Sequence, residues 1–337
     1  MKPLVSVVVP SYCHEQYIND CLNSIIAQRY QNIELIVIDD CSKDGTYDIL
    51  LSRKEELEDR FLRVVLQRNE ENLGVVKTEN KLVGLSQGKY IKSIASDDML
   101  LDNAIEDLVN YFEQHQEYDI VFSNALYCTE DETYPIKSPD SYKRAYEEIP
   151  CLDGNVLQAL YENDFIQAPT VLFKRETFEK YGLYDENLTI EDWEYWLRIA
   201  TNGQIGYCDV ITVGYRISGQ SLSHFSMDAD GRRRLRNMYQ NQYKILKKYE
   251  KSERIDVRQG YRCFYRKMLH EAIDLEDESL QNEIMKSLKE KNIQMDIETR
   301  MKYVCYRLHI LRAIQSIKRV LGRQTVETYK TKKDSVK

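Results

Sequence analysis

The sequence has no long apolar run. Its longest uncharged apolar stretches are the length of a β-strand, as in Val5-Ser6-Val7-Val8-Val9, and none approaches the roughly 20 residues that span a bilayer. Met1-Lys2-Pro3 leads directly into this stretch without a small-residue cleavage site, so we expect no secretory signal. Hydrophobic residues at 42% and charged residues at 30% are instead typical of a folded globular protein.

Sequence motifs of several common protein classes are also missing. Neither GxGxxG nor GxxxxGK[ST] occurs, which argues against a Rossmann dehydrogenase and a P-loop kinase. The eight cysteines are scattered without a CxxC pair, and the five histidines form no HxH or HExxH cluster that would favour zinc. We therefore expect free thiols, a reducing compartment and a cytoplasmic location.

The net charge of −8 conceals a division along the chain. Residues 231–337 contain 27 basic and 14 acidic side chains, whereas residues 1–230 contain 20 basic and 41 acidic ones. The sign changes near the Gly- and Ser-containing stretch 218–223, where we place a domain boundary. The acidic front would repel nucleic acid, so we expect no nucleic-acid partner.

The front of the chain alternates between apolar strands and amphipathic helices. We expect strands at residues 4–9, 33–38, 62–67 and 89–95, with helices at about 15–29, 45–58 and 74–87. Continuously apolar strands alternating with helices predict an α/β fold, in which a mostly parallel central sheet is covered by helices on both faces.

Polar residues follow three of these strands. They are Pro10-Ser11-Tyr12, Asp39-Asp40 and Ser96-Asp97-Asp98, and the carboxyl ends of parallel strands meet at one ligand-binding edge. Each segment taken singly also suits a helix cap or a turn. Paired carboxylates are harder to explain by capping, because a cap uses only one of them. Such oxygen clusters suit Mg²⁺ or Mn²⁺ holding a diphosphate.

At this point the sequence resembles the family 2 glycosyltransferases with the glycosyltransferase-A fold. The resemblance covers about residues 4–217 through the segments 5–46, NLG (72–74), GKYIKSIASDDM (88–99) and EDWEYWLRIA (191–200). It implies an inverting transfer of a sugar from a nucleoside diphosphate, most simply UDP. We expect a catalytic domain over 1–225, with the nucleotide-sugar side at about 1–125 and the acceptor side at about 126–225. A basic helical C-terminal region would cover 226–337.

The resemblance also implies roles for individual residues. Family members commonly carry Asp-x-Asp as the metal motif, and Ser96 here occupies its first position. Two further residues have ordinary alternatives: Lys77 would meet the diphosphate or be a solvated surface lysine, and His224 would bind the metal or be a polar loop residue. The implied nucleotide-sugar contacts are Pro10, Tyr12, Asp39, Asp40, Lys77 and Asp97, and the implied metal contacts are Asp98 and His224.

The resemblance assigns the general base to Asp192, with Glu191 as the runner-up. A carboxylate in this role takes the proton of the acceptor hydroxyl as the new bond forms. The local sequence also fits a capping box, with Thr189 as the helix cap and Asp192 at the third helical position. Trp193 and Trp196 share a helix face, where they line the acceptor site or belong to the core.

The basic C-terminal region contains an apolar helical stripe. Its positions recur at spacings of three and four and comprise Val304, Leu308, Leu311, Ile314, Ile317 and Leu321. Such a helix packs against the catalytic domain or a partner chain, which includes a homo-oligomer, or it lies on anionic lipid. A lipid-linked acceptor would favour the lipid surface.

These observations predict a metal-assisted inverting glycosyltransferase that builds a bacterial surface glycan. Its partners would be a nucleotide-sugar donor and a glycan or lipid-linked acceptor, and it would be peripheral on the inner face of the plasma membrane. Two alternatives stay open. A sugar nucleotidyltransferase would need a Gly-rich basic loop after the first strand, which Pro10-Ser11-Tyr12-Cys13 is not. A degenerate scaffold subunit would tolerate Ser96.

Overall fold

The computed structural model describes residues 2–136, 142–146, 156–217 and 226–308. The chain divides into two compact units. The sheet unit consists of residues 1–156 and 165–217, and the helical unit consists of residues 157–164 and 218–337. Among the described residues, no helix combines the length and apolar character needed to cross a bilayer.

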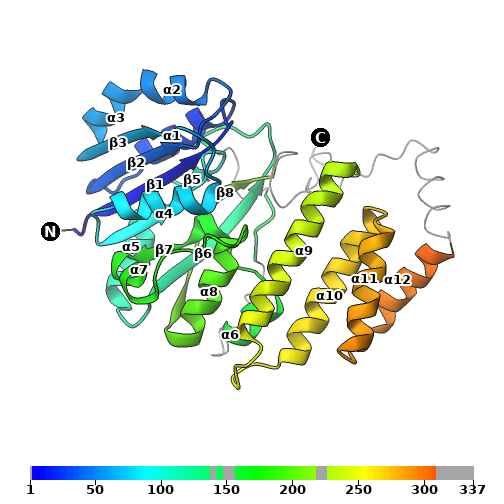
Figure 1. Cartoon of the computed structure of the whole chain (residues 1–337). Helices are drawn as coiled ribbons and strands as arrows, with labels where there is room; N and C mark the ends of the chain where they lie inside the picture. The colour runs from blue at the N-terminus through cyan, green and yellow to red at the C-terminus, as the bar shows by residue number, and fades with distance from the viewer. Residues whose placement is uncertain (1, 137–141, 147–155, 218–225, 309–337) are drawn as a thin grey trace, which may run out of the picture. The chain divides into compact units, whose positions relative to one another are not determined.

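The sheet unit is built on an eight-stranded mixed sheet, shown in Figure 1. The strand order is β3-β2-β1-β4-β7-β6-β8-β5, and the first four strands are parallel to one another. Strands β5 and β7 are antiparallel to their neighbours. The strands are β1 (Val5–Ser11), β2 (Ile33–Asp39), β3 (Arg63–Arg68), β4 (Tyr90–Ser93), β5 (Met99–Leu100), β6 (Ile120–Cys128), β7 (Leu172–Lys174) and β8 (Ile205–Arg216).

Helices cover both faces of this sheet because its central strands are apolar on both sides. On one face, Val5, Val7 and Val9 of β1 belong to a large core that also contains apolar residues of α1 and α5. Helix α4 packs on β1 and β2. The helices are α1 (Ile18–Ile26), α2 (Thr46–Ser52), α3 (Lys54–Arg60), α4 (Val75–Leu85), α5 (Ala104–Gln114), α7 (Arg175–Tyr181) and α8 (Glu191–Asn202), with the short 3-10 helix η2 (Ala168–Thr170).

The predicted α/β fold with a parallel core is confirmed. The helix expected over 45–58 is two helices, because the chain turns at Arg53, whose side chain donates to Asn23 Oδ1 of α1 (2.8 Å). The antiparallel β7 was not predicted. It follows η2, where the buried ammonium of Lys92 on β4 donates to the carbonyls of Pro169 and Val171. Burial lowers the pKa of Lys92 to about 7.

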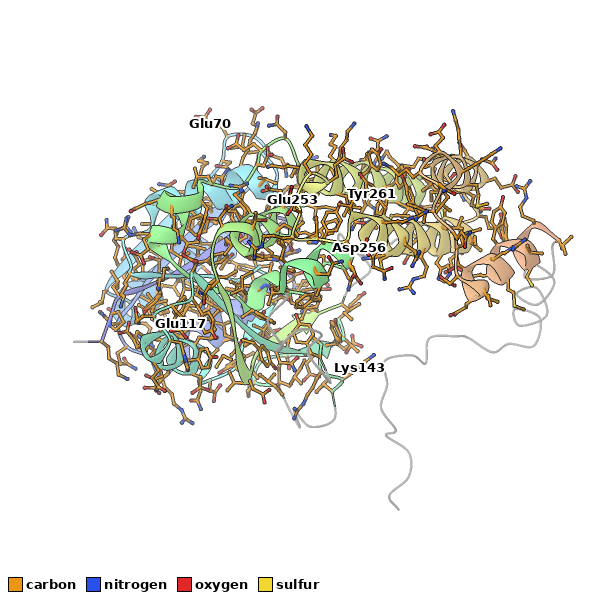
Figure 2. All side chains as sticks on the ribbon, turned by 90° about the horizontal axis from the view of Figure 1, so that it is seen from below. Glu70, Glu117, Lys143, Glu253, Asp256 and Tyr261 are labelled. Atoms are coloured by element: carbon orange, nitrogen blue, oxygen red, sulfur yellow. The ribbon has the colours of Figure 1, made fainter. Side chains whose placement is uncertain are left out.

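Over residues 226–308, the described part of its main segment, the helical unit contains four consecutive helices, which lie together with α6. The sequence analysis assigned residues 157–164 to the catalytic domain, whereas in the structure they belong to this unit. The hydroxyl of Tyr161 donates to Leu246 O (2.9 Å), and a Cβ at Gly260 would lie 2.3 Å from the Tyr161 ring. The absent side chain at Gly260 therefore lets α10, where Figure 2 labels Tyr261, approach α6. The helices are α6 (Val156–Glu162), α9 (Ala229–Tyr249), α10 (Val257–Asp274), α11 (Glu278–Glu290) and α12 (Ile297–Arg307).

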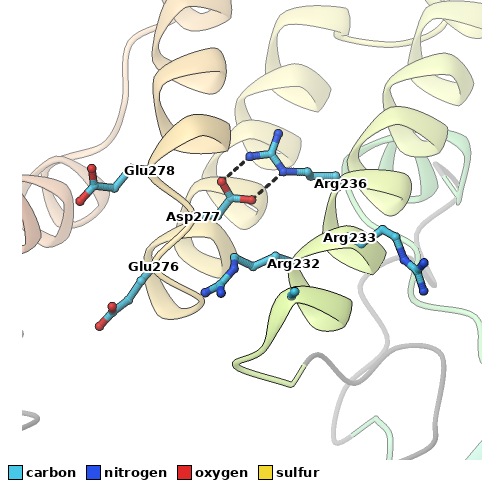
Figure 3. A pocket seen from close by; sticks show the side chains of 7 residues that line it. Arg232, Arg233, Arg236, Glu276, Asp277 and Glu278 are labelled. Atoms are coloured by element: carbon cyan, nitrogen blue, oxygen red, sulfur yellow. Dashed lines mark hydrogen bonds and ion pairs between the residues drawn. The ribbon is translucent and has the colours of Figure 1, made fainter.

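The helical unit has an open pocket of about 420 Å³ between α9 and the start of α11 (Figure 3). Its arginines are already engaged. Arg236 forms a two-bond ion pair with Asp277, Arg233 pairs with Asp230, and Arg232 donates to a backbone carbonyl. The pocket is therefore balanced in charge, and the arginines stabilise the helix packing.

Candidate functional site

Loops that follow the parallel strands meet at one edge of the sheet. The N–H of Asp40, after β2, donates to Ser11 O at the end of β1 (2.8 Å). The N–H of Cys13 donates to Ser42 Oγ (2.8 Å), which joins the loops after β1 and β2 a second time. The structure thus brings together the first two segments that the sequence analysis selected.

Two residues of these loops have a left-handed backbone. Cys13 has φ 54° and Cys41 has φ 63°, which side chains with a Cβ rarely adopt. Each such residue costs on the order of 1–3 kcal/mol and persists only where the surrounding contacts enforce it. The backbone strain lies directly beside Tyr12 and Asp40, and strained residues of this kind concentrate at functional sites.

The carboxylate of Asp40 holds the loop before α4. Its Oδ1 accepts from the N–H of Leu73 and from Asn69 Nδ2, and its Oδ2 accepts from the N–H of Gly74, all at 2.8 Å. Gly74 has φ 83°, which explains a glycine at this turn. A carboxylate can accept about four hydrogen bonds, so Asp40 positions residues 72–74 and retains one acceptor direction.

The other predicted nucleoside contacts differ in exposure. Tyr12 is 39% exposed, and burial followed by smaller charge effects raises its pKa. Pro10 lies inside β1. Asp39 is fully buried, and its Oδ2 accepts from the N–H of Ser42 (3.0 Å) and from Arg68 Nε (3.2 Å). Its Oδ1 has no partner among the described residues. Asp39 is thus a structural anchor, while Tyr12 presents an exposed ring.

The acidic turn after β4 presents two unequal carboxyl groups. Asp98 is 2% exposed, and its Oδ1 accepts from the N–H of Arg216 (2.8 Å). Burial, followed by the charge of Asp97, raises the pKa of Asp98 well above its usual range. The Asp97 side chain is 15% exposed. Asp97 is therefore the more accessible carboxylate of the predicted metal motif.

The side chain of Arg216 connects this turn to two other segments. Its Nε donates to Asp97 O (2.8 Å), and its Nη1 donates to Glu130 O (2.9 Å) and Glu132 O (2.6 Å). Nη2 lies 3.5 Å from a carboxylate oxygen of Asp20. The guanidinium is fully buried and stacks over the ring of Tyr17 at 4.5 Å. Its donors are thus engaged by the protein itself.

The imidazole of His14 lies against the same turn. Its Nδ1 is 2.8 Å from Ser96 Oγ, and its Nε2 is 3.8 Å from Asp97 Oδ2. Sequence reasoning missed this residue because it searched for histidine pairs along the chain. The available signal was that His14 and Ser96 both follow strands that end at the same edge.

The proposed base lies at the start of α8. The helix begins at Glu191 after Ile190, which forms no side-chain cap, so Asp192 is the second helical residue and the alternative of a capping box at Thr189 is not what forms. Asp192 Oδ1 accepts from the N–H of Trp193 (2.7 Å). Burial raises the pKa of Asp192 to about 6. Burial and then the charge of Asp192 raise the pKa of Glu191 well above its usual range.

A third carboxyl group, Glu79 of α4, links this pair to the sheet edge. Its Oε1 accepts from Ser93 Oγ (2.7 Å) at the end of β4, while its Oε2 is buried without a partner among the described residues. Burial raises the pKa of Glu79 to about 7, and its charge acts on Glu191. The neighbouring Asn80 exchanges two hydrogen bonds with the backbone of Tyr184, which ties α4 to the segment before α8. Sequence reasoning missed Glu79 because nothing in its local pattern indicates burial.

The remaining predicted residues contribute less. Lys77 is exposed, and the described residues give it no ion pair. His224 lies outside the described residues. Trp193 and Trp196 are both buried, and Trp196 stacks on Phe173 with ring centroids 5.7 Å apart. Both tryptophans therefore belong to the core.

The chemistry of the acidic turn fits a divalent cation. Asp97 and Asp98 supply the oxygen donors that Mg²⁺ and Mn²⁺ prefer, and a cation would favour the ionised form of the buried Asp98. Within the described part of the chain, no group of three or more His, Cys, Asp or Glu residues gathers as a complete metal site. A cation here would therefore need further ligands from water or from a bound phosphate.

A comparison with known protein families gives one clear match. The profile of glycosyl transferase family 2 matches residues 6–182, which is more than half of the chain. The putative teichuronic acid biosynthesis glycosyltransferase TuaG of Bacillus subtilis is 29% identical over 270 residues, covering 78% of this chain and 94% of TuaG.

Solved structures show the same fold at lower sequence identity. TarS 1–349 of S. aureus in complex with UDP-GlcNAc has a TM-score of 0.55 and 19% identity, covering 80% of this chain and 73% of that one. In a longer TarS structure, the matched region covers 43% of the TarS chain. The mannosyltransferase PcManGT of Pyrobaculum calidifontis, in complex with GDP-Man and Mn²⁺, has a TM-score of 0.56 and 16% identity, covering 96% of this chain and 85% of that one. At these identities the likeness concerns the fold.

We predict that Arg216→Lys destabilises the protein strongly. Lysine cannot replace the planar fork of donors, so the carbonyls of Asp97, Glu130 and Glu132 lose their partners. Disrupting a buried ionic network of this kind costs about 3–5 kcal/mol. Thermal and urea unfolding would measure the loss.

The matched control is Arg175→Lys, because Arg175 forms an exposed ion pair with Glu179. Such surface pairs contribute about 0–1 kcal/mol, so this variant should unfold like the wild type. Equal stability of the two variants would contradict the role given to Arg216.

Proposed function

Since the chain belongs to glycosyltransferase family 2, we propose that it transfers a sugar from a nucleoside diphosphate, first of all UDP, to an acceptor hydroxyl group with inversion at the anomeric carbon. The convergence of the β1, β2 and β4 loops at one edge supports this proposal most directly. It joins an exposed Tyr12 ring, the carboxylate of Asp40 and the acidic turn at Asp97 within one hydrogen-bonded set of loops. Tyr12 suits stacking on the base, Asp40 suits a hydrogen bond to the base, and Asp97 suits the ribose or the cation that accompanies the diphosphate.

In this proposal the nucleoside lies between the loops after β1 and β2. The ring of Tyr12 offers an exposed aromatic face for stacking, and Asp40 retains an acceptor for a base N–H. Asp97 holds the ribose or the cation that accompanies the diphosphate. A bound Mg²⁺ or Mn²⁺ would offset the negative charge that builds on the departing nucleoside diphosphate. The PcManGT complex with Mn²⁺ supports such a requirement.

Asp192 is the proposed general base. Its carboxylate takes the proton of the acceptor hydroxyl, whose oxygen attacks the anomeric carbon while the bond to the diphosphate breaks on the opposite side. One bond forms as the other breaks, so the configuration inverts. A pKa of about 6 leaves Asp192 ionised near neutral pH yet basic enough to hold a proton. Burial and then the charge of Asp192 raise the pKa of the neighbouring Glu191 well above its usual range.

The acceptor we propose is a glycan or a lipid-linked glycan of a bacterial cell surface. The likeness to TuaG, a putative teichuronic acid biosynthesis glycosyltransferase, supports this setting. Helix α12 adds a structural observation: Ile297, Met301, Val304 and Leu308 recur at spacings of four, three and four, and all are exposed. The remaining positions of the predicted stripe, from Leu311 onward, lie outside the described residues. We propose that this face of α12 contacts an anionic membrane surface.

We predict that UDP raises the melting temperature of the protein and that Mn²⁺ enlarges the shift. A ligand that binds only the folded state stabilises it by an amount that grows with the logarithm of the ligand concentration once that concentration exceeds Kd. Asp97→Asn should keep the metal-free shift and lose the part added by Mn²⁺, whereas the exposed Asp59→Asn of α3 should behave as wild type. If millimolar UDP with Mn²⁺ produces no shift, the proposed function is wrong.

We predict that Asp192→Asn lowers turnover by about 10²–10⁴-fold, the usual contribution of a general base, with UDP binding preserved. Glu191→Gln is the matched control, because glutamine imitates a protonated glutamate, and it should retain most of the activity. In the wild type, kcat/KM should fall about tenfold per pH unit below pH 6, because protonation of Asp192 removes the base. If the Asp192→Asn variant stays active, Asp192 is not the general base, and Glu191 becomes the candidate for that role.

We predict that Met301→Asp combined with Val304→Asp abolishes co-sedimentation with anionic vesicles. The substitutions place charge on the exposed apolar face, where no packing is lost. Asn282→Asp on α11 adds the same kind of charge at an exposed site and should leave binding unchanged. Undiminished binding by the double variant would mean that α12 is not the contact.

A further inference from the structure

The ring of His14 is fixed on several sides. The N–H of its backbone donates to Thr46 Oγ1 (2.9 Å), and the ring packs edge-on against Tyr17 with centroids 6.0 Å apart. Its Nδ1 lies 2.8 Å from the fully buried Ser96 Oγ. The side chain therefore has one well-defined orientation, and Nε2 is the ring nitrogen nearer to Asp97.

The distance between Nε2 and Asp97 Oδ2 is informative. At 3.8 Å it exceeds the 2.7–3.2 Å or so of a hydrogen bond, so the two atoms do not bond directly. Two ligands about 2.1–2.2 Å from one cation, at angles between 90° and 120°, are separated by about 3.0–3.8 Å. The separation of 3.8 Å lies at the upper end of this range, so the two atoms can share a metal ion at a ligand angle near 120°.

Ser96 explains which ring nitrogen is available. In the tautomer that carries its proton on Nδ1, the hydroxyl oxygen accepts from Nδ1–H and the lone pair of Nε2 is free to bind a metal ion. Histidine ligands of metals characteristically donate the other ring N–H to an oxygen in this way, and that second contact fixes the tautomer. Ser96 occupies the position of the acidic turn where a third carboxylate is missing. Its proposed role there is to orient the imidazole of His14.

We propose that His14 binds, through Nε2, the divalent cation that accompanies the donor diphosphate, with Asp97 as the adjacent ligand and Ser96 as the residue that orients the imidazole. This proposal rests on the proposed function, which supplies the diphosphate. Two protein ligands suffice, because Mg²⁺- and Mn²⁺-type sites complete their shells with phosphate oxygens and water. A nitrogen ligand also predicts a preference for Mn²⁺ over Mg²⁺, since Mg²⁺ favours oxygen alone.

The experiment uses the full chain with UDP and Mn²⁺. The electron paramagnetic resonance signal of free Mn²⁺ measures binding, and electron spin echo modulation from ¹⁴N reports a nitrogen ligand directly. We expect ¹⁴N modulation in the wild type that is absent from Mn²⁺–UDP in buffer. His14→Ala should lose it and bind Mn²⁺ at least tenfold more weakly. Ser96→Ala should keep the modulation and weaken binding by about tenfold, as loss of an orienting contact commonly does.

Two further variants make the result specific. His115→Ala removes a surface histidine whose ring contacts Glu117, and it should bind Mn²⁺ like the wild type. His14→Asp replaces the nitrogen ligand with an oxygen ligand. This variant should bind Mg²⁺ more tightly than His14→Ala does, and it should prefer Mn²⁺ over Mg²⁺ less than the wild type does. The spectrum of the unmodified protein decides the question even if a variant fails to fold.

The outcomes separate this proposal from the proposed function. If UDP binds without metal but the wild type shows no ¹⁴N modulation, or if His14→Ala binds Mn²⁺ with unchanged affinity, the assignment of His14 is overturned and the transferase proposal stands. That result would make His14 an ion-pair partner of Asp97. If UDP fails to bind in any condition, the proposed function fails first.

Discussion

The burial of the Arg216 guanidinium is the constraint on which the geometry of the acidic turn depends. A fully buried cation is stable only when its donors are matched, and here backbone carbonyls of two separate turns supply most of the acceptors. One of these carbonyls belongs to Asp97, and the N–H of Arg216 also binds the carboxyl of Asp98. The turn therefore has little freedom to rearrange. Contacts with Arg216, at the end of β8, hold the carboxyl groups of this turn in place before any ligand binds. The free-energy cost of positioning them is therefore part of folding and does not weaken the binding of a ligand.

The balance of charge at the site supports the cation that we propose. The proposed donor diphosphate is an anion, and the acidic turn carries two carboxyl groups, one of them buried. Arg216 cannot neutralise both the turn and a diphosphate, because its donors are occupied within the protein. Lys77, the basic residue that sequence patterns place nearby, is exposed on α4. A divalent cation between Asp97 and the diphosphate turns a repulsion into an attraction, and an imidazole adds a ligand without adding negative charge.

The sequence predicted those features that depend on local periodicity. Apolar runs located the parallel strands, and the rule that strand ends share one edge located Tyr12, Asp40 and Asp97. Features that depend on pairing between distant segments were not predictable. Asp98 is buried because β5 pairs with β8 more than a hundred residues away. His14 reaches Ser96 because Cys13 has a left-handed backbone conformation. The sequence does not indicate this conformation, since the residue is not a glycine. The capping register at Asp192 also failed, because the helix starts one residue later than the pattern of Thr189 suggested.

The three carboxyl groups Glu79, Glu191 and Asp192 pose a separate problem of charge. No basic side chain is among the groups that shift their pKa values. Burial raises the pKa of all three, and the charges of Asp192 and Glu79 raise the pKa of Glu191 further. Neighbouring acids that interact in this way titrate as a coupled group. Asp192 accepts from the N–H of Trp193, and its pKa of about 6 lies below the value of about 7 for Glu79. Asp192 therefore ionises at a lower pH than Glu79. A carboxylate that is ionised near neutral pH beside other acids with raised pKa values is in keeping with the role of general base that we propose for Asp192.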